Sequence, residues 1–67
     1  MAVSRVTEIT ASSPRSVEAA IEEGLRRASR TLRRITGLEV EAIKAKVVDG
    51  KIREYRVSLR VTFLPEE

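Results

Sequence analysis

The dipeptide Asp49-Gly50 constrains the fold of this chain most, because it separates two apolar stretches and predicts a tight β-hairpin. Both central residues of such a turn need positive φ, which aspartate and glycine tolerate. The strand after the turn alternates regularly, with apolar Tyr55, Val57, Leu59, Val61 and Phe63 on one side and Arg56, Ser58, Arg60 and Thr62 on the other. One face of the hairpin is therefore available for a core, and the other for solvent, a subunit or a ligand.

The small size of the chain limits its core. Its 67 residues suffice for a single domain, residues 1–67, and such domains often need disulfides, metals or oligomerisation for stability. The sequence contains no cysteine and no histidine, which excludes disulfides and zinc sites built on those residues. Oligomerisation remains, and we expect the chain to associate with copies of itself.

The charge balance is basic but mixed. The net charge is +3 and the isoelectric point about 10.0, with 13 basic and 10 acidic residues. Base stacking needs exposed aromatic side chains, whereas Tyr55 and Phe63 belong to the apolar side of the last strand, so we expect no nucleic-acid partner. No apolar run approaches the roughly 18 residues of a membrane span, and the N-terminus lacks a signal-peptide core. We therefore expect a cytoplasmic protein without a membrane partner.

Residues 3–10 predict the first strand, because they are rich in β-branched side chains and precede a Ser-Ser-Pro sequence. Val6 and Ile9 fall on opposite faces, which indicates an edge strand or a bend. Ser13 and Pro14 then predict the start of a helix, with Ser13 as the capping residue.

This helix is expected to run to about Ile35, with Gly37 just beyond it as the C-terminal stop. Its apolar stripe consists of Val17, Ile21, Leu25, Ala28, Leu32 and Ile35. Glutamates occupy its first half, and five arginines, Arg26, Arg27, Arg30, Arg33 and Arg34, occupy its second half. This segregation complements the helix dipole and indicates a solvated face, although the arginine cluster could also contact an anion.

The second strand, residues 38–48, changes its apolar side partway along. Leu38, Val40 and Ala42 share one phase, and Ile43, Ala45 and Val47 share the other, which requires a bulge, a sharp twist or burial on both faces. Ile52 is likewise out of phase with the strand that follows it. We expect the half of the hairpin near Leu38 and Phe63 to cover the helix, and the half near the turn to bury its apolar side against a neighbouring subunit.

The predicted order of elements is strand, helix, strand, strand. The fold class is therefore α+β, with a β-α-β-β order and a three-stranded antiparallel sheet packed on one long helix. Such a sheet has one covered face and one open face.

The residue inventory gives no support for an enzyme. Without cysteine and histidine, the common nucleophile–base pairs cannot be built, and we predict no catalytic residues. Glu39 and Glu41 could form a carboxylate pair, but they alternate with apolar residues and are interpreted as the polar face of a half-buried strand. The three glycines form no phosphate-binding fingerprint, and no clustered metal ligands are present.

Several short motifs, taken in order and spacing across essentially the whole chain, resemble the dodecin family. They are Ile9-Thr10-Ala11-Ser12-Ser13-Pro14, Val17-Glu18-Ala19-Ala20-Ile21, Arg27-Ala28, Thr31-Leu32, Leu38-Glu39-Val40, Asp49-Gly50-Lys51-Ile52, Glu54-Tyr55-Arg56-Val57 and Leu59-Arg60-Val61-Thr62-Phe63. The resemblance implies a β-α-β-β subunit whose sheet partly wraps its helix. It also implies a hollow homododecamer of trimers and dimers that binds or stores a small molecule without catalysis, typically a flavin such as riboflavin or FMN.

In the flavin-binding members that the resemblance points to, two isoalloxazine rings stack between tryptophans at a two-fold axis, and a glutamine of the last strand hydrogen-bonds the ring edge. The tryptophan position falls on Gly37 and the glutamine position on Arg56, and the chain contains no tryptophan. Each lost aromatic pair removes about 1 kcal/mol beyond the lost burial. Arg56 still offers planar donors for a ring, a carboxylate or a phosphate.

The expected cofactor-binding residues are Gly37, Leu38 and Arg56, and the expected ligand is of flavin or phosphate-cofactor type. The alternative is a structural or interaction assembly with no bound cofactor, in which Arg56 pairs with an acidic residue such as Glu39 or Glu41.

Overall fold

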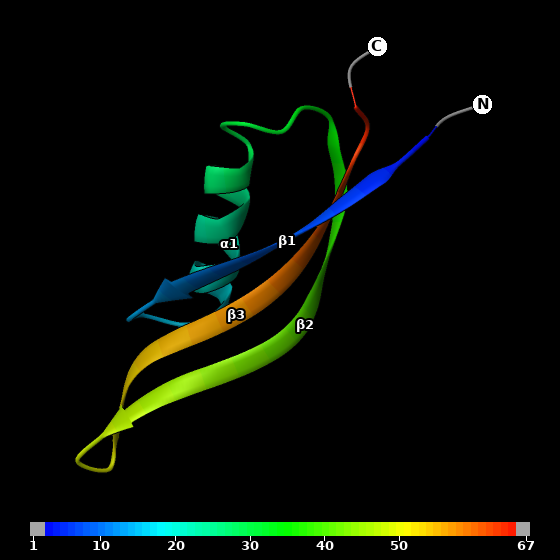
Figure 1. Cartoon of the computed structure of the whole chain (residues 1–67). Coiled ribbons are helices and arrows are strands. Elements are labelled where there is room, and N and C mark those ends of the chain that lie inside the picture. The colour runs from blue at the N-terminus through cyan, green and yellow to red at the C-terminus, as the bar shows by residue number, and fades with distance from the viewer. Residues whose placement is uncertain (1–2, 66–67) are drawn as a thin grey trace.

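The computed structural model describes residues 3–65 and has the predicted β-α-β-β order. Strand β1 spans Arg5–Ser13, helix α1 Val17–Ala28, strand β2 Ile35–Val48 and strand β3 Lys51–Phe63. The three strands form one antiparallel sheet in the order β1-β3-β2, and α1 packs against β1 and β3 on one face (Figure 1). The predicted fold class is confirmed. Strand β1, in which Val6 and Ile9 fall on opposite faces, lies at the edge of the sheet, as the sequence indicated.

The β2–β3 hairpin turns at Asp49 and Gly50, as predicted. Their φ angles are 54° and 74°, and Val48 pairs with Lys51 across the turn. Figure 1 shows that this hairpin extends well beyond the helix. The turn-proximal half of the hairpin is therefore not covered by α1.

Two irregularities in the β2–β3 pairing explain the changes of phase in the sequence. Val40 pairs with Leu59 and Ala42 with Ser58, so Glu41 is an extra residue, one position before the predicted change. Nearer the turn, Lys46 pairs with Glu54 and Val47 with Ile52, which makes Arg53 extra in β3. Both bulges restore the apolar residues to the side of the sheet that carries the helix.

The helix starts later than the sequence predicted. The predicted cap, Ser13, continues β1 and pairs with Tyr55, and its hydroxyl accepts from the Arg15 amide at 3.0 Å. Ser16 caps the helix instead, with its hydroxyl accepting from the Ala19 amide at 2.9 Å. Strand pairing thus extends β1 past the predicted limit at residue 10 and moves the helix start by three residues.

The helix also ends earlier, at Ala28, and does not reach Ile35. The Leu32 amide still donates to the Ala28 carbonyl, but Arg34 adopts a φ of 54° and its carbonyl accepts from the Leu64 amide at 3.1 Å. Ile35 then pairs with Phe63 as the first residue of β2. The prediction that Gly37 stops the helix was therefore wrong, because sheet pairing overrides the helical spacing of Leu32 and Ile35.

The core lies between α1 and the centre of the sheet. Its fully buried residues are Ala20, Val57, Leu59 and Val61, packed against partly buried Ile9, Ala11, Val17, Ile21, Leu32, Ile35, Leu38 and Val40. The apolar side predicted for the last strand is thereby confirmed. The cluster is small, as the length of the chain requires.

Gly24 permits the close approach of the helix to the sheet. A Cβ atom added there would lie 2.7 Å from Leu59 Cδ1 and 3.1 Å from Ala11 Cβ. Gly37 is different, because a Cβ added there has no neighbouring atom within 4 Å.

We predict that Gly24→Val lowers the free energy of unfolding by about 1–3 kcal/mol, because the added methyl groups overpack the core at Leu59. Denaturant unfolding at a fixed subunit concentration measures the change. The control is Gly37→Val, which points into open space and should change the free energy by less than about 0.5 kcal/mol. Equal destabilisation by both substitutions would contradict this account of Gly24.

Candidate functional site

The three predicted ligand-binding residues do not meet within one chain. Gly37 and Leu38 lie at the start of β2, opposite Thr62 and Val61, whereas Arg56 lies opposite Lys44. Thr62 and Arg56 are six positions apart in β3, which corresponds to about 20 Å along an extended strand. A single chain therefore presents two separate half-sites.

The first half-site is a pocket of about 600 Å³ between the end of α1 and the start of β2. Its lining consists of Leu25, Ser29, Leu32, Arg34, Ile35, Thr36, Gly37 and Leu38. Four of these side chains are aliphatic and Arg34 is the single charged one. The predicted residues Gly37 and Leu38 thus border a mainly aliphatic surface.

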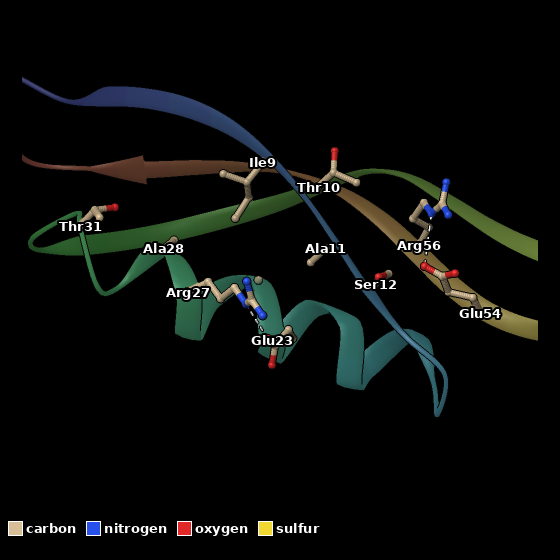
Figure 2. Close-up of a pocket in the computed structure, with 11 residues that line it drawn as sticks. Ile9, Thr10, Ala11, Ser12, Glu23, Arg27, Ala28, Thr31, Glu54 and Arg56 are labelled. Carbon is tan, nitrogen blue, oxygen red and sulfur yellow. Dashed lines mark hydrogen bonds and ion pairs between the residues drawn. The ribbon is translucent and has the colours of Figure 1, made fainter.

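The second half-site surrounds Arg56. One pocket of about 540 Å³ follows the outer edge of β1 beside α1, and its lining ends at Glu54 and Arg56. Figure 2 shows two ion pairs in this lining: Arg27 Nε lies 2.7 Å from Glu23 Oε2, and Arg56 Nε lies 3.5 Å from Glu54 Oε2. Ile9 and Ala11 point from β1 towards the helix (Figure 2).

Glu54 is held in its ionised form. The hydroxyl of Ser12 donates to the Glu54 carboxylate, and this hydrogen bond, followed by the one from Arg56, lowers the pKa of Glu54. Ser12 lies directly opposite Arg56 in the sheet, which brings the hydroxyl to the two charges. The sequence analysis missed Glu54, although its position two residues before Arg56 on the same side of a strand was the available signal.

Cations also gather on the open face of the hairpin. Lys44 is directly opposite Arg56, and both border a hollow of about 350 Å³ together with Ala45 and Lys46. Like charges directly opposite each other in a sheet destabilise it, and an anion between them would remove the repulsion.

Glu39 and Glu41, which the sequence analysis considered as a carboxylate pair, both lie beside Arg60 on the surface. Arg60 Nη2 lies 2.7 Å from Glu41 Oε2 and 3.5 Å from Glu8 Oε2, and Glu39 pairs opposite Arg60. Both Glu39 and Glu41 are exposed, as their interpretation as the polar face of a strand requires. Neither of them contacts Arg56, whose partner is Glu54.

Two arginines of the predicted helical cluster share one glutamate. Glu23 pairs with Arg26 at 2.6 Å and with Arg27 at 2.7 Å, and these hydrogen bonds lower the pKa of Glu23. The Glu23–Arg26 pair has the i,i+3 spacing and the Glu23–Arg27 pair the i,i+4 spacing that bring side chains together on a helix. Arg30, Arg33 and Arg34 lie outside the helix, because α1 ends at Ala28.

Comparison with known proteins agrees with this geometry. Residues 3–66 match the family model described as Dodecin. The chain belongs to the dodecin family. A dodecin of Thermus thermophilus is 37% identical over 65 residues, which cover 97% of this chain and 94% of that protein.

Solved dodecins share the fold. The dodecin from Streptomyces davaonensis is 36% identical and superposes with a TM-score of 0.94, covering 98% of this chain and 97% of that one. An arginine-to-alanine mutant of the T. thermophilus dodecin is also 36% identical, with a TM-score of 0.95 and full coverage of both chains. A calcium-chelating calcium dodecin of Mycobacterium tuberculosis is 34% identical, with a TM-score of 0.83 and coverage of 96% and 91%.

The flavin that the dodecin family implies finds no stacking partner on the described surface. No aromatic residue lines either half-site, and Tyr55 and Phe63 are partly buried on the helix side of β3. Gly37, at the tryptophan position of the flavin-binding pattern, opens onto free space. The residues present do not fit a ring sandwich between aromatic side chains.

Two further properties of the described residues bear on function. Among residues 3–65, no group of three or more potential ligands could hold a metal ion. Over the same range, no helix combines the length and the hydrophobicity needed to cross a membrane.

We predict that Ser12→Ala raises the pKa of Glu54, because the largest stabilising contact of its carboxylate is lost. A pH titration of the Glu54 carboxyl by NMR measures this shift. The control Ser58→Ala removes another partly buried hydroxyl of the sheet and should leave the pKa of Glu54 unchanged.

The same lowered pKa has a defined effect on stability. Since Glu54 binds its proton less tightly in the folded chain than in the unfolded one, it stabilises the fold above the ordinary pKa of glutamate. This contribution is lost as the pH falls through the folded-state pKa. The acid-induced loss of stability should therefore be smaller in Ser12→Ala than in the wild type, and an equal loss would contradict the assignment.

Proposed function

We propose that this chain is a subunit of a hollow homododecamer that binds or stores a small molecule between its subunits and catalyses no reaction. Membership of the dodecin family supports this function. The proposed ligand is of the flavin or phosphate-cofactor type, held near Gly37, Leu38 and Arg56.

The observation that carries the proposal is the uncovered apolar surface near the turn of the hairpin. Ile43, Val47 and Ile52 are 58%, 59% and 51% exposed. Ile43 pairs with the buried Val57, and Val47 pairs with Ile52, so all three lie on the side of the sheet that carries the helix. Apolar side chains grouped on one side of an uncovered hairpin favour contact with another subunit.

The separation of the two half-sites supports a ligand site shared between subunits. Gly37 and Leu38 are about 20 Å from Arg56 along the sheet. In our proposal, the start of β2 of one copy lies beside β3 of another in a symmetric contact, which joins the two half-sites. Such a site contains Arg56 only when the assembly is intact.

The charges near Arg56 favour a ligand that carries a phosphate. Lys44 and Lys46 lie beside Arg56, and a guanidinium binds phosphate oxygens through paired hydrogen bonds. Because stacking aromatics are missing, FMN should bind more tightly than riboflavin, which has the same ring system but no phosphate.

One contact favours the alternative, an assembly without a cofactor. Arg56 is already paired with Glu54 at 3.5 Å, and Glu54 is also bound by Ser12. An arginine whose charge is satisfied within its own subunit has less to gain from an external anion.

We predict that the wild-type protein is an assembly of twelve 7.5 kDa subunits, about 90 kDa, and that Val47→Glu dissociates it. The added carboxylate would be buried in the subunit contact without a partner. Light scattering and native mass spectrometry measure the mass and any small molecule retained.

The matched control is Val48→Glu, which adds the same charge one residue later. Val48 pairs with Lys51 and lies on the opposite side of the strand from Val47. This variant should remain assembled. A wild-type protein of about 7.5 kDa would sink the proposal, and dissociation of both variants would contradict the assignment of the interface to the helix side.

We predict that Gly37→Trp raises the affinity for riboflavin at least about tenfold, because an indole supplies the missing stacking surface. The open space around Gly37 admits the new side chain without a change in the fold. Quenching of riboflavin fluorescence measures the binding. Gly37→Leu adds bulk without an aromatic ring and should produce no such gain, so equal quenching by both variants would argue against stacking.

A further inference from the structure

The pocket at the end of α1 combines an aliphatic surface with a single cation. Leu25, Leu32, Ile35 and Leu38 supply the aliphatic part, and Leu25 is 37% exposed although it belongs to the apolar stripe of the helix. The volume of about 600 Å³ lies within the usual range for small-molecule sites. No aromatic ring and no carboxylate lines it.

Arg34, the cation of this pocket, occupies an unusual backbone conformation. Its φ of 54° lies in the left-handed region, which costs free energy for residues other than glycine, asparagine and aspartate. The Leu64 amide donates to its carbonyl at 3.1 Å and fixes the turn. A long cationic side chain is thus held at a position where glycine would be less strained.

The contacts of residues 3–65 do not account for the Arg34 charge. Among residues 3–65, no carboxylate forms an ion pair with Arg34, in contrast to Arg26, Arg27, Arg56 and Arg60. The carbonyl end of α1 disfavours an anion nearby, but this effect is weaker than a direct charge-assisted hydrogen bond from a guanidinium.

Gly37 borders the pocket through its backbone, because it pairs with Thr62 and faces the open side of the sheet, whereas Leu38 pairs with Val61 and faces the helix. Gly37 has no positive φ, and a Cβ atom there would meet nothing within 4 Å, so neither the backbone nor the packing requires glycine. A side chain at this position would extend from the open face of the sheet, away from Leu38.

We infer that this pocket binds an amphiphilic anion, an aliphatic chain that ends in a carboxylate or phosphate. The head group contacts Arg34, and the chain lies on Leu25, Leu32 and Leu38. This inference rests on the proposed function and narrows its ligand class, because the pocket includes Gly37 and Leu38 and offers aliphatic contacts in place of ring stacking.

Calorimetric titration of the assembled protein tests the inference with octanoate and its neutral analogue octanamide. Octanoate should bind at least about tenfold more tightly, because only the carboxylate pairs with the guanidinium. Octyl phosphate, added in a separate arm, should behave like octanoate. Equal affinity for octanoate and octanamide, or no binding of octanoate at millimolar concentration, would overturn the inference.

Arg34→Asn and Arg30→Asn provide the matched variants. Asparagine tolerates positive φ, so the turn at residue 34 is retained, and Arg30 does not line the pocket. Only Arg34→Asn should reduce octanoate affinity to that of octanamide. An equal loss in both variants would show a general charge effect and contradict the role of Arg34.

Light scattering on the same samples separates the two hypotheses. An intact assembly that does not bind octanoate would overturn this inference alone, whereas a monomeric wild-type protein would overturn the proposed function.

Discussion

The close packing of helix α1 on the central strand β3 is the interaction on which the rest of the structure depends. Val57, Leu59 and Val61 are almost completely buried, and Ala20 and Gly24 let the helix approach them closely. Because β3 pairs with both other strands, this contact also positions β1 and β2. The core is small, so each buried residue accounts for a large share of the stability of the subunit.

The short helix leaves half of the hairpin without an intramolecular partner. The sheet continues to the turn at Asp49 and Gly50, whereas α1 covers only the part of the sheet that is far from this turn (Figure 1). Bulges at Glu41 and Arg53 keep Ile43, Val47 and Ile52 on the same side of the sheet as the buried Val57. The same side of the sheet thus provides the subunit core at one end and an exposed apolar surface at the other.

This geometry also divides the residues that were predicted to bind a ligand. The start of β2 offers aliphatic side chains and Arg34, and the middle of β3 offers Arg56 with Glu54 and Lys44 nearby. Each half-site has a different chemistry, and neither provides an aromatic ring. The chain therefore has the dodecin fold, and the residues predicted to bind a ligand lie in two chemically different surroundings.

The sequence alone determined the features that depend on local rules. The turn at Asp49-Gly50 follows from the φ preferences of those residues, the core side of β3 from strict alternation, and an irregularity in the hairpin from breaks in that alternation. The strand pairing then decided that each break is a bulge, where the sequence also allowed a sharp twist or burial on both faces. It also placed Gly37 and Arg56 at the positions where this chain departs from the flavin-binding pattern.

The helix ends, the half-sites and the partner of Arg56 were decided only by the tertiary structure. Strand pairing takes Ser13 into β1 and Ile35 into β2, which shortens the helix although Ser13-Pro14 and the spacing of Leu32 and Ile35 favour a longer one. Ser12 pairs in the sheet with Arg56, which lies 44 positions later in the sequence, and Glu54 precedes Arg56 by two residues on the same strand. The Ser12 hydroxyl therefore reaches the Glu54 carboxylate. Such long-range contacts depend on which strands pair and in which register, and local propensities do not encode that choice.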